Sequence, residues 1–262
     1  MTDNGEVLRS QENGVLRLIL NRPEAANALT DSMRHTLVSA LELATDDRDV
    51  RAVIIAANGK HFCTGADVGN IAAQPHAGQA MRRVMCGAQQ VIKAIQDCSK
   101  PVVAAVQGTA AGLGAHIAFA SDLTVASEDA KFIEVFVRRG ITVDAGGAWL
   151  LPRLVGMQKA KEMIYLGDSI SGIDAAALGL VNRVVPGDEL DVAVTKLAER
   201  LAAGPTLAIA MAKRQLNVAF ESDRATALLA EAMAQDICTR SEDAAEGIAS
   251  FREKRAPQFK GY

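Results

Sequence analysis

The sequence lacks the residue patterns that mark metal-binding and disulfide-rich proteins. Its four cysteines show no C-x-x-C pairing, and its four histidines form no close ligand pair. We therefore expect no metal site and no disulfide framework, and cysteines used in this way fit a reducing cytoplasm. The residues in question are Cys63, Cys86, Cys98 and Cys238, with His35, His61, His76 and His116.

Long hydrophobic runs and blocks of positive charge are missing as well. The formal net charge is −3, which argues against a nucleic-acid partner. The most apolar stretch, 101–122, is interrupted by Gln107, His116 and three glycines, so we expect no membrane span. The first residues lack the basic and apolar regions of a signal peptide. These observations together favour a cytoplasmic protein without a membrane or nucleic-acid partner.

What remains is the composition of an ordinary globular chain with a large core. Of its 262 residues 49% are hydrophobic and 23% are charged. Short apolar runs typical of buried strands alternate with helical patterns through the first two thirds, which predicts an α/β layered fold. After Gly204-Pro205 the pattern is helical up to Arg255. The predicted strands are Val15–Leu20, Ala52–Ala57, Val102–Val106 and Leu123–Ser127, and helices are predicted over 30–43, 81–95, 113–120 and from 145.

The stretch 101–122 combines a predicted strand, a glycine turn and a helix start near Leu113. Such a turn leaves backbone N–H groups unpaired at the positive end of a helix, where an anion or a developing oxyanion is stabilised. Close packing of small residues explains the glycines equally well. Their spacing, G-x-x-x-G-x-G, matches neither the dinucleotide fingerprint nor a phosphate-binding loop.

Three polar residues beside glycines or within apolar segments are candidates for chemistry. Asp67 follows a glycine turn, Asp144 precedes Ala-Gly-Gly, and His116 lies in an apolar helix. Taken singly, each has a structural explanation, because aspartates favour turns and helix caps and a core histidine is usually hydrogen-bonded.

Taken together, the motifs resemble the crotonase, or enoyl-CoA hydratase/isomerase, superfamily, and they span nearly the whole chain in the family's order. The resemblance is carried by NRPEAANAL (21–29), HFCTGADV (61–68), KPVVAAVQGTAAGLGAHIAFASDLTVAS (100–127), AKF (130–132), GITVDAGGAWLLPRLVG (140–156) and FREKRAPQFKG (251–261).

The resemblance implies a spiral of ββα units over 1–200 and a helical trimerisation region over 201–262. It further implies a homotrimer or hexamer and an acyl-CoA thioester substrate, as in fatty acid metabolism. It implies no metal and no separate cofactor, since coenzyme A is part of the substrate.

The resemblance also assigns roles to particular positions. The backbone amides of Ala66 and Leu113 match the oxyanion hole that holds the thioester oxygen. Phe136 and Trp149 are expected to shape the acyl pocket, together with the 71–78 loop. Residues expected along coenzyme A are Ala25, Ala26, Thr64, Gly65, Asp67, Val68, Lys254 and Lys260, the two lysines toward its phosphates and, as one possibility, from a neighbouring subunit.

The chain departs from the family at the two positions where a hydratase carries its glutamates. These positions are His116 and Phe136, and Phe136 has no proton to exchange. Asp144 stands where relatives that shift a double bond, or attack the substrate with a carboxylate, carry an aspartate. An apolar acyl pocket would raise the pKa of that carboxyl group and suit it to proton transfer.

Four interpretations follow. The first is double-bond isomerisation through Asp144, and the second is hydration with help from His116. The third is nucleophilic attack by Asp144 on an aryl-CoA, which is weakened because the activating histidine of such enzymes matches Lys93. The fourth is a non-catalytic acyl-CoA-binding protein in which Asp144 only caps a helix.

Overall fold

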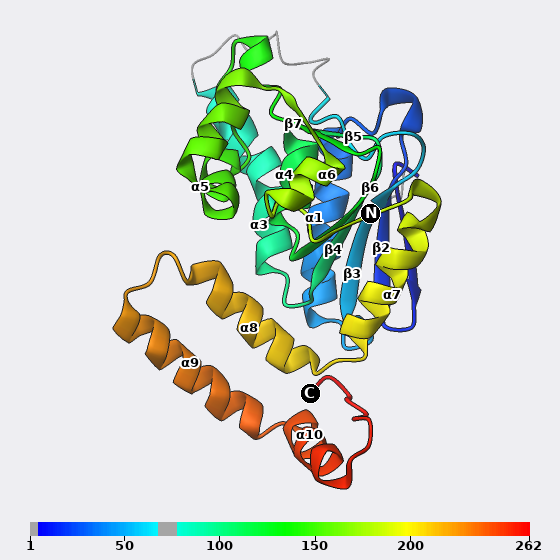
Figure 1. The fold of residues 1–262 in the computed structure, drawn as a ribbon, viewed down its shortest axis with the longest axis vertical. Coiled ribbons are helices and arrows are strands. Elements are labelled where there is room, and N and C mark those ends of the chain that lie inside the picture. The colour runs from blue at the N-terminus through cyan, green and yellow to red at the C-terminus, as the bar shows by residue number, and fades with distance from the viewer. Residues whose placement is uncertain (1–4, 68–77) are drawn as a thin grey trace.

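The computed structural model describes residues 5–67 and 78–262, and its main element is a six-stranded sheet (Figure 1). The strand order is β1-β2-β3-β4-β6-β9, and every neighbouring pair except β1 and β2 is parallel. The apolar runs form its buried centre, as expected for strands covered on both faces. The strands are β1 (Val7–Glu12), β2 (Val15–Leu20), β3 (Ala52–Ala57), β4 (Val102–Val106), β6 (Leu123–Ser127) and β9 (Arg183–Val185).

The strand β1 was not predicted, and it pairs with β2 through a two-residue turn. Asn13 and Gly14 both have positive φ, 51° and 75°, as this tight hairpin requires. β1 is the edge strand and largely exposed, so its sequence VLRSQE does not have the apolar character of the inner strands.

Helices cover both faces of this sheet. Because side chains alternate along a strand, Val53 and Ile55 face the main core, whereas Ala52 and Ile54 face α7. The helix α1 begins after Thr30, whose side chain accepts a hydrogen bond from the Met33 amide, as predicted. The main-core helices are α1 (Asp31–Asp46), α3 (Gln89–Asp97) and α4 (Leu113–Ala120), and the other face carries α7 (Leu190–Ala202).

A smaller sheet and further helices surround the start of α4. β7 is parallel to β5 and antiparallel to β8. The helix α5 contains Pro152 and is interrupted at Gly156, whose φ of 76° and ψ of 163° are not helical. These elements are β5 (Thr109–Ala111), β7 (Lys131–Ile133), β8 (Ser169–Ser171), α2 (Gln79–Arg83), the π-helical turn Val84–Ala88, α5 (Gly147–Leu166) and α6 (Gly172–Ala177).

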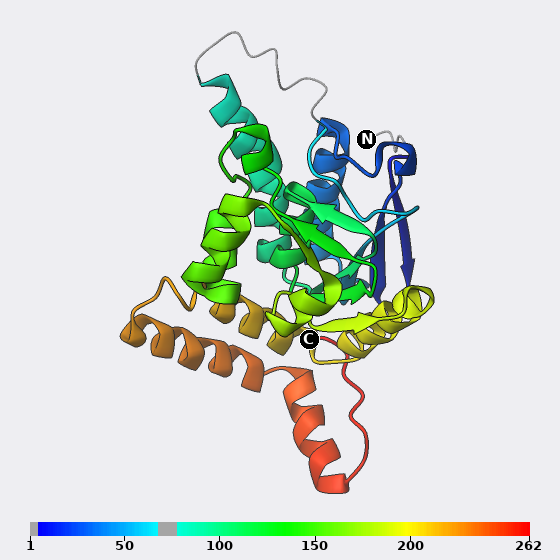
Figure 2. The same ribbon diagram turned by 45° about the horizontal axis from the view of Figure 1, so that its top comes forward.

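Three helices after Gly204-Pro205 complete the chain: α8 (Thr206–Val218), α9 (Arg224–Thr239) and α10 (Glu242–Glu253). The buried Lys213 of α8 docks on the core, because its Nζ donates to the Ile95 carbonyl at 2.8 Å and pairs with Asp122 at 2.7 Å. The helices α9 and α10 extend away from the sheet (Figure 2). No helix within the described residues combines the length and apolar character needed to cross a bilayer.

Candidate active site

The loop 64–67 lies directly against the beginning of α4. Just before this loop, Cys63 forms an isolated parallel β-bridge with Ala110. Within the loop, Ala66 forms another with Leu29. A side chain on Gly65 would begin 3.1 Å from the Ala111 carbonyl and 3.9 Å from the Leu113 nitrogen, and its φ of 107° also requires glycine. The two glycine-marked loops of the sequence therefore form one structural unit.

Gly114 sets how closely the two segments approach. A Cβ atom at this position would lie 2.1 Å from the Cys63 carbonyl oxygen and 2.7 Å from the Cys63 Cβ. No side chain fits into these distances, so the contact between the 61–67 segment and α4 depends on glycine here.

Two backbone amides at this junction, those of Ala66 and Leu113, are unpaired. The neighbouring Asp67 amide donates to the Leu29 carbonyl at 3.0 Å, whereas neither the Ala66 nor the Leu113 amide has an acceptor within residues 5–67 and 78–262. Leu113 is the first residue of α4, and its N-cap, Gly112, offers no side chain. Unpaired N–H groups at such a position attract a negatively charged oxygen.

Asp144 approaches the same region from the other side, just before α5. The N-cap of α5 is Gly146, with no side-chain capping bond, and Asp144 contributes only its backbone carbonyl to the Gly147 amide, at 2.9 Å. The alternative that the Asp144 side chain caps this helix is therefore wrong. Its carboxyl group is half-buried and available for another role.

A cavity of about 310 Å³ connects Asp144 with Ala66, and we call it the Asp144 cavity. Its size is at the lower end of the roughly 300–1,000 Å³ usual for ligand pockets. Most of its lining is apolar, but two arginines take part. The lining residues are Arg34, Ala66, Ala80, Arg83, Val84, Ala88, Ile141, Thr142 and Asp144.

The surroundings of Asp144 raise the pKa of its carboxyl group above the ordinary 3.8, as the sequence suggested. The largest cause is burial, which disfavours the charged form, and nearby Glu134 adds to it. His116 and Arg34 act in the opposite direction because positive charge stabilises the carboxylate.

Near Asp144 lies a buried pair, His116 and Glu134, that was not predicted from the sequence. His116 is fully buried, and its Nε2 lies 3.0 and 3.1 Å from the two carboxyl oxygens of Glu134. Its Nδ1 has no partner among the described residues. The ring stacks on Phe136 with centroids 5.5 Å apart. Glu134 was detectable in the sequence only as a single acid between Ile133 and Val135.

Phe136 and Trp149, which the resemblance assigned to the acyl pocket, do not line the Asp144 cavity. Phe136 is buried against His116 and beside Gly112. The Trp149 Nε1 donates to Glu221 at 3.0 Å, and the Arg153 guanidinium lies 4.1 Å above its ring. A role of either residue in shaping the acyl pocket stays a prediction.

Most of the residues expected along coenzyme A do gather beside this junction. The Thr64 amide donates to the Ala26 carbonyl at 3.2 Å, which joins the 25–26 loop to the 64–67 loop. Asp67 forms an ion pair with Arg22 at 2.7 Å. The fully buried Asn27 side chain ties the same loop to the backbone oxygens of Asn58 and His61. Val68 and residues 71–77 of the predicted pocket loop lie outside the described residues.

Lys254 and Lys260 lie elsewhere in the same chain. Lys254 ends α10, and Lys260 pairs with Glu242 at 3.0 Å. The C-terminal segment returns to Arg51, which donates to the Phe259 carbonyl at the amino end of β3. The site loops follow the carboxyl end of β3, at the other end of this strand, so the contact of these lysines with coenzyme A stays a prediction.

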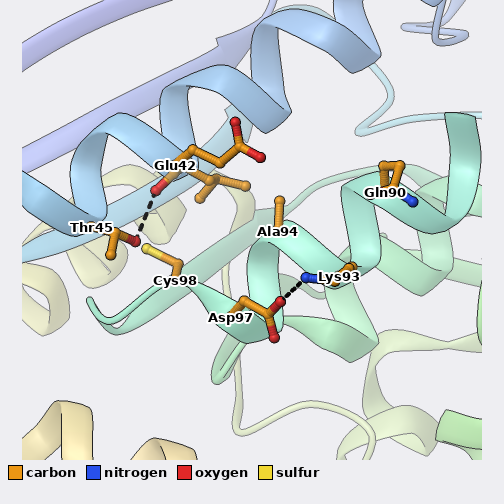
Figure 3. A pocket seen from close by; sticks show the side chains of 8 residues that line it. Glu42, Thr45, Gln90, Lys93, Ala94, Asp97 and Cys98 are labelled. Carbon is orange, nitrogen blue, oxygen red and sulfur yellow. Dashed lines mark hydrogen bonds and ion pairs between the residues drawn. The ribbon is translucent and has the colours of Figure 1, made fainter. Parts of the chain in front are cut away.

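Lys93 lies in a different hollow, between α1 and α3. Figure 3 shows its ammonium group directed at Asp97, with which it forms an ion pair. Asp97 also raises the pKa of Lys93. None of the residues that line this hollow also lines the Asp144 cavity.

The sheet, the small second sheet and the helical tail define an α/β enzyme of the crotonase fold. A family model described as enoyl-CoA hydratase/isomerase matches residues 10–262, and the chain belongs to this family. It is 37% identical over 249 residues to "Probable enoyl-CoA hydratase" of Rhodobacter capsulatus, covering 95% of both chains. It is 34% identical over 260 residues to the 1,2-epoxyphenylacetyl-CoA isomerase of Escherichia coli, covering 97% of this chain and 98% of the relative.

Solved structures agree with the relatives. An enoyl-CoA hydratase of Mycobacterium smegmatis superposes with a TM-score of 0.91 at 34% identity, over 97% of this chain and 98% of the other. The names of the relatives include both hydratases and isomerases. Family membership therefore defines an enoyl-CoA hydratase/isomerase enzyme and leaves the reaction open.

Proposed function

We propose that this enzyme isomerises the double bond of an enoyl-CoA thioester, with Asp144 as the acid/base. The observation that carries the proposal is the cavity that Asp144 shares with Ala66. Asp144 is the sole carboxylate among the described residues that line it, and isomerisation needs one group that removes and returns the same proton.

In this reaction the Asp144 carboxylate takes a proton from C2 of a 3-enoyl thioester. The electron pair moves into a dienolate, whose negative charge rests on the thioester oxygen. The unpaired amides of Ala66 and Leu113 stabilise that oxygen, and Asp144 returns the proton at C4. One such donor is worth roughly 3 kcal/mol of barrier. No co-reactant is needed, since atoms and charge balance within the substrate and Asp144.

The burial of His116 disfavours the alternative of hydration. The ring is fully buried and turned with Nε2 onto Glu134, so this nitrogen is already occupied. Lys93 in its separate hollow offers no help to a nucleophilic Asp144. Because Gly146 caps α5, Asp144 also has no structural capping role of the kind that a non-catalytic protein would retain.

The test compares turnover of matched 3-enoyl-CoA and 2-enoyl-CoA substrates of four to eight carbons. We expect 3-enoyl thioesters to become conjugated 2-enoyl thioesters, seen by ultraviolet absorbance and chromatography, and 2-enoyl thioesters to gain no water. Formation of 3-hydroxyacyl-CoA at a comparable rate would contradict the proposal.

The amide of Leu113 can be tested by substitution, because proline fits the first helical position and has no N–H group. Leu113→Pro removes both this donor and a buried side chain, so Leu113→Ala serves as the matched control for lost packing. We expect Leu113→Pro to lower kcat roughly 10²-fold further than Leu113→Ala. Equal activities of the two variants would exclude the Leu113 amide from the mechanism.

We also propose that α8–α10 assemble the chain into trimers or pairs of trimers. Large apolar side chains are exposed on these helices and in the turn between α8 and α9, with Phe220 of that turn exposed to 75% and Phe251 of α10 to 85%. Such surfaces mark protein–protein contacts. Light scattering should give three or six times the chain mass, and a monomer at micromolar concentration would refute the assembly.

A further inference from the structure

The Asp144 cavity contains a positive charge that the proposed proton transfer does not use. Arg34, on α1, has a relative exposure of 5% and is one of the residues that line the cavity. The Nη1 atom donates to the Leu29 carbonyl at 3.0 Å, and Nη2 forms an ion pair with Asp31. The Nε atom has no hydrogen-bond partner among the described residues.

A buried arginine donor without a partner is costly, which makes it informative. Buried polar groups are nearly always paired, and exceptions point to a functional role or a missing ligand. Burial and the nearby Arg83 both lower the pKa of Arg34, although an arginine stays charged at neutral pH. The apolar part of the cavity gives no reason to place a charge there.

The neighbouring helix places no side chain beside this nitrogen. Gly87 stands in the π-helical turn Val84–Ala88, and a Cβ atom on it would lie 3.4 Å from the Arg34 Nε. Because Gly87 carries no side chain, nothing from that residue covers the donor. Helical irregularities of this kind are frequent at functional sites.

A second arginine lines the cavity from α2. Arg83 is half-buried and interacts electrostatically with Arg34, so the cavity is lined by two arginines, of which Arg34 also pairs with Asp31, and by one carboxylate. Arginine is the side chain best suited to a carboxylate, since its planar fork can donate two parallel hydrogen bonds.

We propose that Arg34 and Arg83 bind a carboxylate on the acyl group, so that the preferred substrates are CoA thioesters of dicarboxylic acids. This inference rests on the proposed function, because it requires the acyl group to enter the Asp144 cavity. The alternative source of an anion is a phosphate of coenzyme A. We favour the acyl carboxylate, since Ala66 and Asp144 line the same cavity and both belong to the reacting end of the ligand in the proposed mechanism.

The test measures binding rather than turnover, with saturated thioesters that cannot react. Isothermal titration calorimetry compares glutaryl-CoA with pentanoyl-CoA, adipyl-CoA with hexanoyl-CoA, and free coenzyme A. The two members of each pair differ in the terminal carboxylate. We expect the wild-type enzyme to bind the carboxylated member of at least one pair about tenfold or more tightly, as one charge-assisted hydrogen bond provides.

Arg34→Gln and Arg83→Gln should each remove most of this preference while affinity for the methyl-terminated thioester and for free coenzyme A stays within about threefold. The exposed Arg82, beside Arg83 on the same helix, supplies the matched control, and Arg82→Gln should retain the full preference. If Arg34→Gln does not fold, the half-buried Arg83 still carries the test.

Equal affinities within both pairs in the wild-type enzyme would overturn this inference and leave the proposed function standing. An equal loss of affinity for free coenzyme A in the arginine variants would also overturn it, since it would identify a phosphate contact. Failure of every CoA thioester to bind would overturn the proposed function as well, so the two failures are distinguishable.

Discussion

Replacing Asp144 by asparagine directly tests the proton transfer on which the proposed isomerisation depends. The substitution keeps nearly the same shape but removes the proton acceptor. Among the described residues no other carboxylate lines the cavity, and His116 is buried on Glu134. Within residues 5–67 and 78–262, no second carboxylate or unpaired histidine nitrogen that lines the cavity is therefore in position to take over the proton.

The expected loss follows from what a positioned acid/base contributes. Proton transfer by such a group is worth about 10² to 10⁴ in rate, so kcat for 3-enoyl-CoA isomerisation should fall by at least about 100-fold. At 1.36 kcal/mol per factor of ten, this is roughly 3 kcal/mol or more of barrier. Binding of the saturated thioesters should change little, because the amides and the cavity walls remain.

The pH dependence gives an independent readout. Since burial raises the pKa of Asp144, the folded state holds this proton more tightly than the unfolded chain. Below the ordinary value of 3.8 the carboxyl group is protonated in both states. As pH rises through the raised pKa, ionisation costs the folded state stability and creates the active base. The wild-type kcat/KM should therefore rise with pH around a midpoint above 3.8.

At neutral pH Asp144→Asn should be as stable as the wild-type enzyme or more stable, because no buried charge remains. Stopped-flow turnover and thermal unfolding of both proteins provide the measurements. Near-full activity of Asp144→Asn would refute the reasoning and make His116 the leading candidate. A loss of stability from Asp144→Ala of the 0.5–2 kcal/mol typical of a helix cap would contradict the structural assignment.

Three further predictions concern the surroundings of the site. Glu134→Gln removes a negative charge that raises the pKa of Asp144, so the acidic limb of the kcat/KM profile should move to lower pH, and an unmoved limb would exclude this coupling. Gly114→Ala forces a Cβ atom against the Cys63 carbonyl and should lower both melting temperature and activity, whereas Gly187→Ala, with nothing within 4 Å, should do neither. Burial raises the pKa of Cys63 to about 12, so native protein at pH 8 should be alkylated at the exposed Cys86 and not at Cys63, as peptide mass spectrometry would reveal.

The inner sheet was predictable because buried parallel strands need apolar side chains on both faces. AVIIAA and VVAAV satisfy this condition, and VLRLIL satisfies it except at Arg17, which pairs with Asp191; the three runs form β3, β4 and β2 as predicted. The edge strand β1 carries polar residues and was not predicted, although the Asn13-Gly14 pair is typical of a tight hairpin turn. β5, β7 and β8 have three residues each, too few to establish a periodicity.

The turn before Leu113 was predictable from its own stretch of sequence, whereas the prediction that joins the Ala66 and Leu113 amides in one site came from the family motifs. The glycines around Leu113 and the raised pKa of Asp144 could be anticipated from local sequence. The contact between His116 and Glu134 joins two elements 18 residues apart, and periodicity does not say which buried acid meets which histidine. In the sequence Arg34 is indistinguishable from an ordinary polar residue of a helix, and only the fold shows that it lines a cavity.

Because the two unpaired amides of Ala66 and Leu113 belong to the main chain, they affect which substitutions the protein tolerates at these positions. Every residue type except proline leaves an N–H group at positions 66 and 113, so a mutational scan would score both positions as tolerant as long as packing is kept. The intolerance would fall instead on the neighbouring Gly65 and Gly114, whose missing side chains let the backbones meet. A map of tolerated substitutions would therefore outline this part of the site by its glycine supports and leave its hydrogen-bond donors unmarked.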